Sequence, residues 1–477
     1  MTSDTLFDFD NTYAQELSEL VVPWQPDEVP APSLVVTNSE LAKELGIDVD
    51  NLDGEAGTSV LSGNRVPDGA TPVAMVYAGH QFGGYSPRLG DGRAVLLGEV
   101  VDNEGNRRDL HLKGSGRTPL SRGGDGKATL GPMLREFLIA EAMHALGVPT
   151  TRALAVAVTG EEVRRETMEP GAVLTRVASS HLRVGTFEYS ARSGDHEAFK
   201  RLVDYAIDRH YPQARDAEQP YLAFFDAVIE EQASLVAEWM LIGFIHGVMN
   251  TDNVTISGEG IDYGPCAFLD RYDPATVFSS IDHAGRYAYG NQPRITTWNL
   301  ARLAETLVEL VDSDFDAAAQ VLTESLNGFQ DRYRAHWIVG MRAKLGLTLA
   351  ADGDGEFFDE LLSLMQTSQL DYTRTFRSLA KSLRDDAWVR RWRERLENES
   401  ASIDRIADAM DAVNPIYIPR NYLVEEVLDA ATAGDMAPFD ELLRVVTEPY
   451  SEHPGWERFA QPAPEGFEDS FRTFCGT

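Results

Sequence analysis

The first half of the chain carries short apolar runs that predict β-strands. RAVLLGEVV and DLHLK flank an Asn-Glu-Gly-Asn turn, which is the pattern of a hairpin over residues 93–113. TPVAMVYAG, TRALAVAVTG and GAVLTRVA have the same character and predict further strands. Residues 1–70 combine a short helical start with turns rich in Pro and Gly, so we expect an N-terminal elaboration packed on this strand-rich part.

Helical periodicity takes over further along the chain. PMLREFLIAEAMHALG has apolar residues at helical spacing, with Pro132 near its start and Gly147 at its end. From about residue 195 the pattern is predominantly helical, and helices are predicted over 223–247, 299–346, 356–383, 386–411 and 420–446. A short strand, VTISGEG, is predicted over 254–260.

This order predicts an α+β fold with two lobes and an extension. We expect a strand-rich lobe over residues 71–194, a helical lobe over 195–346 and a helical C-terminal extension over 347–477. The length of 477 residues and the apolar content of 43% are sufficient for a large core.

Composition narrows the class of protein. No stretch approaches the roughly 18 to 20 apolar residues of a membrane helix, and the start of the chain is acidic, so we expect a cytoplasmic protein that does not bind membranes. Two cysteines are too few for a disulfide-built scaffold or a CxxC zinc site.

The charge balance is strongly negative. Acidic residues number 76 against 42 basic ones, only six of which are Lys, giving a net charge of −34. Such a chain is a poor general binder of nucleic acid, and salt relieves its self-repulsion, so we infer a host with a salty cytoplasm. The acidic surface favours basic client regions, although high salt would screen that attraction.

One segment departs from this average. Seven cations and only two acids lie between residues 107 and 135: Arg107, Arg108, Lys113, Arg117, Arg122, Lys127 and Arg135, with Asp109 and Asp125. Salt bridges along a surface strip could explain such an island. The run KGSGRTPLSRGGDGKATLG is also rich in Gly and exposes many backbone N–H groups, so a site for phosphate groups is the favoured interpretation.

A second group of chemical interest follows the long apolar helix. HGVMNTDNVTISGEGIDYG contains Asn250, Asp252, Asn253 and Asp262, whose hard oxygens suit Mg²⁺ or Mn²⁺. In isolation, NTDN would more readily be a turn capped by Asx side chains. Its place directly after a helix ending in His-Gly favours the metal-binding interpretation.

The two groups together have the layout of a protein kinase. Lys113 ends a predicted strand and Glu136 lies in the next helix, where a kinase pairs a Lys and a Glu against the nucleotide phosphates. Asn253 and Asp262 match the metal-binding Asn and the Asp of a DFG-type motif. Val248, however, stands where a kinase carries its catalytic Asp.

Long segments resemble the selenoprotein O family, also called the YdiU family. They include YAGHQFGGYSPRLGDGRA, LHLKGSGRTPLSRGGDGKATLGPMLREFLIAEAMHALGVPTTRALAV, PGAVLTRVASSHLRVGTFEY, HGVMNTDNVTISGEGIDYGPCAFLD, RYAYGNQPRITTWNLARLAE and NPIYIPRNYLVEEVL. The resemblance implies a bilobal pseudokinase fold and transfer of AMP from ATP, or UMP from UTP, to Ser, Thr or Tyr hydroxyls of proteins. It also implies a nucleotide bound in the flipped orientation relative to kinases, with pyrophosphate as the product. We expect the protein to act as a monomer.

The resemblance also implies roles for individual residues. The ATP-binding set comprises Gly90, Gly92, Arg93, Lys113, Asp125, Gly126, Arg176, Arg183 and Asp262, with Glu136 orienting the lysine. Asp252 corresponds to the catalytic base, and Asn253 and Asp262 to the ligands of Mg²⁺ or Mn²⁺. A carboxylate beside a metal pair is expected to have an ordinary or depressed pKa.

Alternatives remain at this point. A conventional phosphotransferase and a catalytically silent nucleotide-binding scaffold share many of these residues. Family members often carry a redox pair near the C-terminus, and Cys475 occupies the last position of that element. Its upstream partner position holds Arg472, and the loop position where some relatives have a further Cys holds Phe278. We therefore expect Cys266 to be a buried residue beside a strand, rather than bridged to Cys475.

Overall fold

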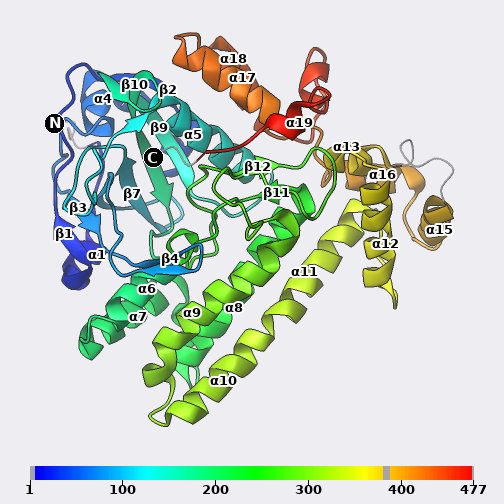
Figure 1. Cartoon of the computed structure of the whole chain (residues 1–477), viewed down its shortest axis with the longest axis horizontal. Coiled ribbons are helices and arrows are strands. Elements are labelled where there is room, and N and C mark those ends of the chain that lie inside the picture. The colour runs from blue at the N-terminus through cyan, green and yellow to red at the C-terminus, as the bar shows by residue number, and fades with distance from the viewer. Residues whose placement is uncertain (1–5, 380–386, 475–477) are drawn as a thin grey trace.

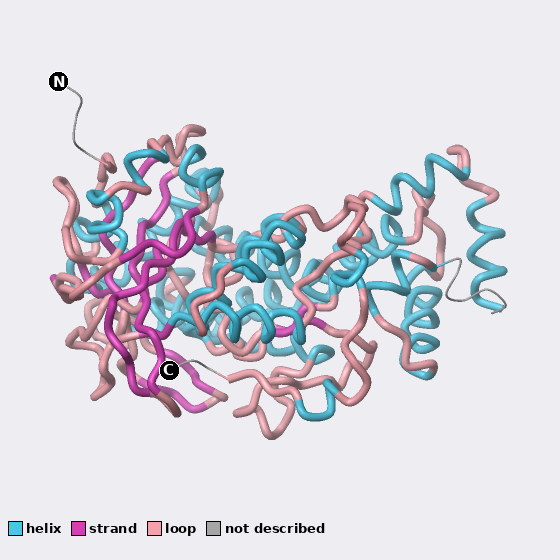
Figure 2. The backbone as a smooth tube through the Cα atoms, turned by 90° about the horizontal axis from the view of Figure 1, so that it is seen from above, coloured by secondary structure: helices cyan, strands magenta, loops and turns pink. Residues whose placement is uncertain are grey.

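The computed structural model describes residues 6–379 and 387–474. Strands gather at one end of the molecule and helices occupy most of the rest (Figure 2). The α+β class predicted from the sequence is therefore confirmed. None of the helices in the described ranges is both long and apolar enough to cross a membrane.

The main sheet has the strand order β1-β3-β6-β7-β10-β9-β2, with β8 paired to β10. Its strands are β1 (Val21–Pro23), β2 (Ser33–Thr37), β3 (Val73–Met75), β6 (Ala94–Val101), β7 (Arg107–Lys113), β8 (Ala128–Thr129), β9 (Arg152–Arg164) and β10 (Met168–Ala178). The N-terminal segment was expected to pack on the sheet as an elaboration. It also extends the sheet itself, because β1 pairs with β3 at one edge and β2 with β9 at the other.

The predicted hairpin is present as β6 and β7, which pair antiparallel from Ala94 opposite Lys113 to Val101 opposite Arg107. Their side chains are largely buried because helices cover the sheet. The N-terminal segment adds four short helices: α1 (Thr12–Glu16), α2 (Ser39–Glu44), α3 (Val49–Leu52) and α4 (Glu55–Leu61). A second hairpin, of β4 (Gly79–Gln81) and β5 (Gly84–Ser86), stands apart from the main sheet.

Helix α5 (Leu130–Ala145) lies against β9 and β10, as its apolar pattern predicted. Gly147 follows its last turn with a φ of 83°, a left-handed conformation that glycine adopts readily and that ends the helix. The arrangement places Glu136 of α5 opposite the end of β7, where Lys113 lies.

The helical part begins earlier than residue 195. Helix α6 (Val184–Ala191) directly follows β10 and was not predicted. The longer helices then follow: α7 (His196–His210), α8 (Pro220–Ile242), α9 (Gln292–Val311), α10 (Phe315–Asn327) and α11 (Phe329–Lys344). Figure 1 shows α8, α9 and α11 running alongside one another below the sheet.

The predicted strand over 254–260 is not a strand. Its side chains close local turns instead: the hydroxyl of Thr255 donates to the carbonyl of Glu259, and Ser257 donates to the Glu259 carboxylate. One isolated bridge joins Thr255 to Arg183. The small sheet nearby is formed by β11 (Phe244–Ile245) and β12 (Ala267–Phe268).

The C-terminal extension is helical, as expected. It contains α12 (Asp354–Thr367), α13 (Tyr372–Arg377), α15 (Ala387–Leu396), α16 (Ile403–Asp411), α17 (Asn421–Thr432), α18 (Ala437–Val446) and α19 (Phe467–Ser470). Helices α17 and α18 return to lie on α5 (Figure 1). Asn421 exchanges two hydrogen bonds with the backbone of Phe268, and buried Arg420 pairs with Asp270 and Asp371, so this pair fastens the extension to β12.

Candidate functional site

A cavity of about 340 Å³ lies between the main sheet and the loop that follows α8 and β11. Its lining includes every residue that the sequence marked for ATP, metal or catalysis: Gly90, Gly92, Arg93, Lys113, Asp125, Gly126, Glu136, Arg176, Arg183, Asp252, Asn253 and Asp262. Seven cationic side chains and five carboxylates line it, the cations being Arg93, Lys113, Arg122, Lys127, Arg165, Arg176 and Arg183. This surplus of positive charge suits a polyanionic ligand.

Lys113 is held between two carboxylates at the base of the cavity. Its Nζ lies 2.5 Å from Glu136 Oε2 and 2.6 Å from Asp262 Oδ1. The predicted contact between Lys113 and Glu136 is therefore present in the structure. Because Lys113 ends β7 and Glu136 lies on α5, the pair joins the sheet to its covering helix.

Two arginines complete this cluster. Arg176 Nη1 lies 2.7 Å from Asp262 Oδ1 and 3.1 Å from Glu136 Oε1. Arg183 Nη1 lies 3.1 Å from Asp262 Oδ2 and donates to the backbone carbonyl of Asp252 at 2.8 Å. Three cations thus surround two carboxylates in a buried setting, which leaves positive charge for incoming phosphate groups.

Asp262 is unusual in both charge and conformation. Burial alone would raise its pKa, but Lys113, Arg176 and Arg183 outweigh burial and hold the pKa of this carboxyl well below its ordinary value. Its φ is 62°, in the left-handed region that non-glycine residues adopt seldom. Arg122, which also lines the cavity, has a φ of 51°. Such strained residues are frequent at functional sites.

Asp252 lies on a single 3-10 turn, Thr251–Asn253, and is only 8% exposed. Its Oδ2 accepts from Gln81 Nε2 at 3.4 Å, whereas Oδ1 is buried and has no hydrogen-bond partner among the described residues. Burial raises the pKa of Asp252 to about 6. The expectation of an ordinary or depressed pKa for Asp252 was therefore wrong for the protein without a bound metal ion. Burial raises this pKa more than the positive charge of Arg183 lowers it.

The donors of this loop fit a hard divalent cation. Asn253 Nδ2 donates to the carbonyl of Val248 at 3.0 Å, which commits the amide nitrogen and leaves the oxygen as the donor atom for a ligand. Asp262 and the unpartnered Oδ1 of Asp252 add carboxylate oxygens in the same cavity. Within the described ranges there is no cluster of three or more His, Cys, Asp or Glu residues arranged for a metal. Mg²⁺ commonly takes one or two carboxylates and completes its shell with phosphate and water.

The cations between residues 107 and 135 divide into two groups. Some face the cavity, as a phosphate site requires, and others form salt bridges. Lys113, Arg122 and Lys127 line the cavity. Arg107 pairs with Asp10, Arg108 with Asp102 and Arg135 with Glu425, so these three arginines form structural salt bridges.

Two of the predicted glycines are required by close backbone approach. A Cβ on Gly126 would lie 2.2 Å from the carbonyl oxygen of Gly116, and a Cβ on Gly90 would lie 2.8 Å from the carbonyl oxygen of Met75. Both have φ values in the left-handed region, at 72° and 90°. Their backbones therefore shape the cavity wall in a way no other residue allows.

Sequence reasoning missed Arg165, which lies at the turn between β9 and β10. Its guanidinium contacts both oxygens of Asp125, at 2.8 and 3.2 Å, and donates to the carbonyl of Lys127. These hydrogen bonds lower the pKa of Asp125. In the sequence Arg165 looks like an ordinary charged turn residue, because only the return of β9 and β10 brings it over the glycine-rich loop.

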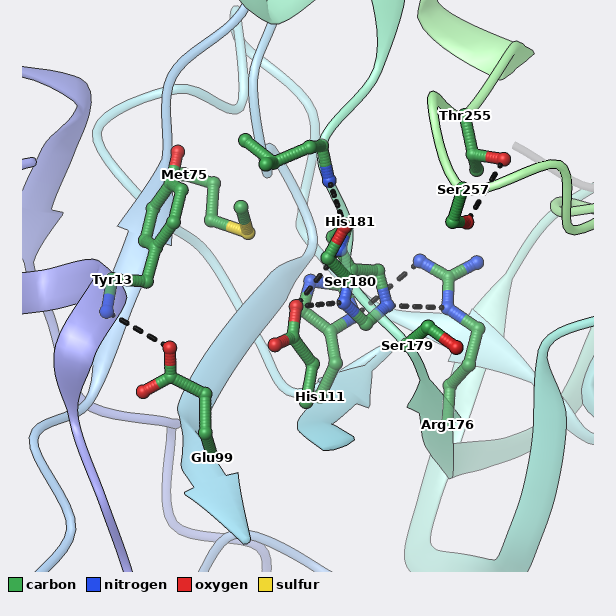
Figure 3. A network of polar contacts seen from close by, with 12 residues as sticks. Tyr13, Met75, Glu99, His111, Arg176, Ser179, Ser180, His181, Thr255 and Ser257 are labelled. Atoms are coloured by element: carbon green, nitrogen blue, oxygen red, sulfur yellow. Dashed lines mark hydrogen bonds and ion pairs between the residues drawn. The ribbon is translucent and has the colours of Figure 1, made fainter. Parts of the chain in front are cut away.

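A buried polar network at the wall of the cavity fixes Arg176 (Figure 3). Arg176 Nε donates to His181 Nε2 at 3.2 Å, and Nη2 lies 3.3 Å from His111 Nδ1. The opposite nitrogens of the two rings face carboxylates, His181 Nδ1 at 2.9 Å from Asp109 and His111 Nε2 at 3.1 Å from Asp91. Both imidazoles are therefore neutral and accept from the guanidinium.

The two histidines stack on each other with ring centroids 4.3 Å apart. Burial and the neighbouring His111 lower the pKa of His181 to about 3, which keeps its ring neutral at physiological pH. The local sequence around His111 and His181 does not predict that they accept hydrogen bonds from Arg176, because they lie on different segments of the chain.

Cys266 is fully buried, and burial raises the pKa of its thiol to about 12. It directly precedes β12, as expected from the sequence. Cys475 lies outside the described residues, and so does any bridge that it could form.

Comparisons with known proteins agree on one family. The family described as "Protein adenylyltransferase SelO" matches residues 5–447. A relative from Cereibacter sphaeroides, "Protein nucleotidyltransferase YdiU", is 57% identical over 99% of this chain and 100% of its own length. Relatives of the same description from Mycolicibacterium paratuberculosis and Mycolicibacterium smegmatis are 56% and 55% identical, over 99% and 100% of this chain.

These matches extend over nearly the whole chain, including all the segments that form the cavity. Together with the cation cluster around Asp262, they show that the chain belongs to the SelO/YdiU family and is a protein nucleotidyltransferase.

Proposed function

We propose that this enzyme transfers AMP from ATP to Ser, Thr or Tyr hydroxyls of proteins, including itself, and releases pyrophosphate. UTP, with transfer of UMP, is the alternative co-substrate. The observation that carries the proposal is the single cavity in which a surplus of cations meets Asp252, Asn253 and Asp262. The family descriptions of adenylyl and nucleotidyl transfer support it.

The phosphate groups would be bound by the sheet side of a kinase-like cleft. In this proposal the β- and γ-phosphates contact Lys113, Arg176 and Arg183 and the backbone around Gly126, where a kinase would hold adenine. Arginine forks and lysine are suited to phosphate oxygens, and the three side chains are already held in place by Glu136 and Asp262. This flipped orientation presents the α-phosphate to the loop that carries Asp252.

The chemical step is a displacement at the α-phosphorus. The acceptor hydroxyl oxygen forms a bond to the α-phosphorus, the bond from that phosphorus to the bridging oxygen of the β-phosphate breaks, and pyrophosphate leaves. Asp252 receives the hydroxyl proton, which its buried and unpartnered Oδ1 is placed to accept. Val248, at the position of the kinase base, has no group that could do so.

Asn253 and Asp262 are the residues that would hold Mg²⁺ or Mn²⁺. Such a cation neutralises negative charge on the phosphate groups.

Labelled ATP tests the proposal against the other two classes of function. With Mg²⁺ or Mn²⁺ present, label in the α-phosphate should become bound to protein, and mass spectrometry should find the mass of AMP on hydroxyl side chains. Transfer of label from the γ-phosphate instead would indicate a phosphotransferase. Binding of ATP without any transfer, under both metals and with UTP as well, would indicate a silent scaffold.

A further inference from the structure

The β4–β5 hairpin lies directly on the loop that carries Asp252. The backbone N–H of His80 donates to the hydroxyl of Thr251 at 2.7 Å, and that of Phe82 donates to Asn250 Oδ1 at 3.0 Å. Gln81, between them, lines the cavity and contacts Asp252. The surface around this hairpin therefore borders the cavity at Asp252.

Arginines stack on aromatic rings along this surface. The guanidinium carbon of Arg192 lies 3.8 Å from the ring centroid of Tyr85. Those of Arg286 and Arg302 lie 4.7 and 4.9 Å from the ring centroid of Trp298. We call this surface the arginine ledge. It consists of Phe82, Tyr85, Arg192, Arg286, Trp298 and Arg302.

The ring of His80 connects the two stacks. Its centroid lies 4.8 Å from that of Tyr85 and 5.3 Å from that of Trp298. Arg192, which follows α6, is thereby brought near Arg286 and Arg302 of a distant part of the sequence, around a single imidazole. Burial, followed by the charges of Arg302 and Arg192, lowers the pKa of His80.

Carboxylates compensate only part of this positive charge. Arg302 pairs with Glu305 at 2.6 Å, and Glu188 Oε1 lies 2.5 Å from Nδ1 of His80. In residues 6–379 and 387–474 no carboxylate lies within ion-pair distance of Arg192 or Arg286, and the Nε and Nη2 atoms of Arg286 are buried without a hydrogen-bond acceptor. Arg192 and Arg286 therefore keep positive charge beside the cavity in a chain of net charge −34.

The tip of the hairpin adds an apolar surface to the ledge. Phe82 is 37% exposed and has a φ of 51°, a conformation that costs free energy for a bulky residue. Its ring centroid lies 5.1 Å from that of Tyr287, whose hydroxyl donates to Asn250 at 2.6 Å. The strained backbone thus keeps a hydrophobic ring exposed next to the catalytic loop.

We propose that the arginine ledge binds an acidic segment of the acceptor protein, with Asp or Glu residues flanking the hydroxyl that is modified. The proposal rests on the function proposed above and names its substrate class. Stacking on Tyr85 fixes the guanidinium plane of the exposed Arg192, which leaves its N–H edges for a carboxylate. Nε and Nη2 of Arg286 are buried, so Arg286 contributes mainly its positive charge beside Trp298. Phe82 contacts an apolar residue of the same segment.

This preference is opposite to what the net charge suggested. An acidic surface attracts basic clients at long range, but in about 1 M salt the Debye length falls to about 3 Å. Only charges in direct contact then contribute to binding. The ledge borders the loop that carries Asp252, so its arginines are the charges that we expect to contact residues flanking the acceptor hydroxyl.

Synthetic peptides test the ledge. Each has a central Ser, Thr or Tyr and differs only in its flanking residues, which are Glu, Gln or Lys. With wild-type enzyme and ATP, the Glu-flanked peptides should have a kcat/KM roughly tenfold above that of the Lys-flanked ones, mainly through KM. In the double variant R192E/R286E this order should reverse, while R192K/R286K should keep part of it.

A matched control changes charge away from the cavity. Arg405 is an exposed residue of α16, and Arg405→Glu makes the same charge change as either ledge substitution. The control should leave both the peptide preference and the KM for ATP unchanged. The circular dichroism spectrum and ATP affinity of R192E/R286E should match the wild type, which shows that the variant is folded and that its nucleotide site is intact.

Three results would overturn the ledge proposal. The first is equal modification of Glu- and Lys-flanked peptides by the wild type, and the second is loss of the preference for Glu-flanked peptides in R405E. The third is a changed KM for ATP in R192E/R286E, which would assign the ledge to nucleotide binding. Fluorescence anisotropy of the Glu-flanked peptides separates this proposal from the proposed function. Binding that R192E/R286E abolishes supports the ledge even if no AMP is transferred, and absence of binding together with unbiased AMP transfer rejects the ledge alone.

Discussion

The orientation of the Arg176 guanidinium depends on buried histidines and carboxylates around it. Its charge is balanced by Glu136 and Asp262, but its plane is set by His181 and His111, which accept from its other edges. Asp109 and Asp91 in turn orient the two rings. Loss of one imidazole would leave a buried donor of Arg176 without an acceptor, a cost of about 1–3 kcal/mol.

We therefore predict that His181→Phe weakens the use of ATP about tenfold or more, seen in kcat/KM for ATP and in direct nucleotide binding. His181→Gln can still offer an oxygen to Arg176 and should recover much of the loss. Circular dichroism and thermal melting provide the folding control. If Phe and Gln variants lose equal activity, His181 contributes packing and does not position the arginine.

At Asp252 the expected effect is on chemistry alone. Asp252→Ala should abolish AMP transfer, because it removes the proposed acceptor of the hydroxyl proton, and leave nucleotide binding largely intact. Label transfer from the α-phosphate and equilibrium binding of ATP measure the two separately. Wild-type transfer by this variant would remove Asp252 from the mechanism.

At the scale of elements, the structure differs from the predicted pattern where side chains bond locally. The hairpin of β6 and β7 and the helix α5 form where their apolar spacing indicated. Residues 254–260 have a β-like composition, yet Thr255, Ser257 and Glu259 hydrogen-bond within the segment and bend it. Helix α6 was not predicted because it is short and follows β10 after only residues 179–183.

The end of helix α11 contains a buried lysine with an electrostatic cost. Burial lowers the pKa of Lys344 to about 7, and its Nζ lies 4.3 Å from the ring centroid of Phe376. In the unfolded chain the pKa of Lys is about 10.4. Between pH 7 and pH 10 the unfolded state therefore binds more protons than the folded state, so the free energy of unfolding should rise with pH over this window.

We predict that Lys344→Met raises the free energy of unfolding at pH 7 by roughly 2 kcal/mol and flattens its increase between pH 7 and pH 10. Urea denaturation at several pH values measures both effects. A variant that keeps the wild-type slope over this window would show that another group titrates there.

At the scale of the whole molecule, we expect the net charge of −34 to lower the stability of the fold through repulsion between carboxylates, and to affect the contacts within the cavity less. Acidic side chains dominate the composition, while the cavity itself has a surplus of cations. The general repulsion between carboxylates is reduced by salt, since the Debye length falls from about 10 Å at 0.1 M to about 3 Å at 1 M. The buried contacts of Lys113 and Arg176 are screened far less.

The melting temperature should accordingly rise as KCl or NaCl is increased from 0.1 M to 2 M, which calorimetry can measure. The salty cytoplasm inferred from composition is a proposal that this experiment supports or rejects. A melting temperature that is constant or falls over this range would contradict it.

The sequence by itself determined the α+β class, the main hairpin, helix α5 and many of the charged residues that line the cavity. It could do so because strand and helix periods are local, and because the motifs of this family are continuous runs. Asp262 lies 149 residues from Lys113 and 86 from Arg176, and only the closure of the two parts of the chain brings them within 2.7 Å. Tertiary structure also decided which cations of the island face the cavity, which histidines hold Arg176 and which arginines gather beside Asp252. Those choices depend on contacts between segments distant in sequence, and no local pattern encodes them.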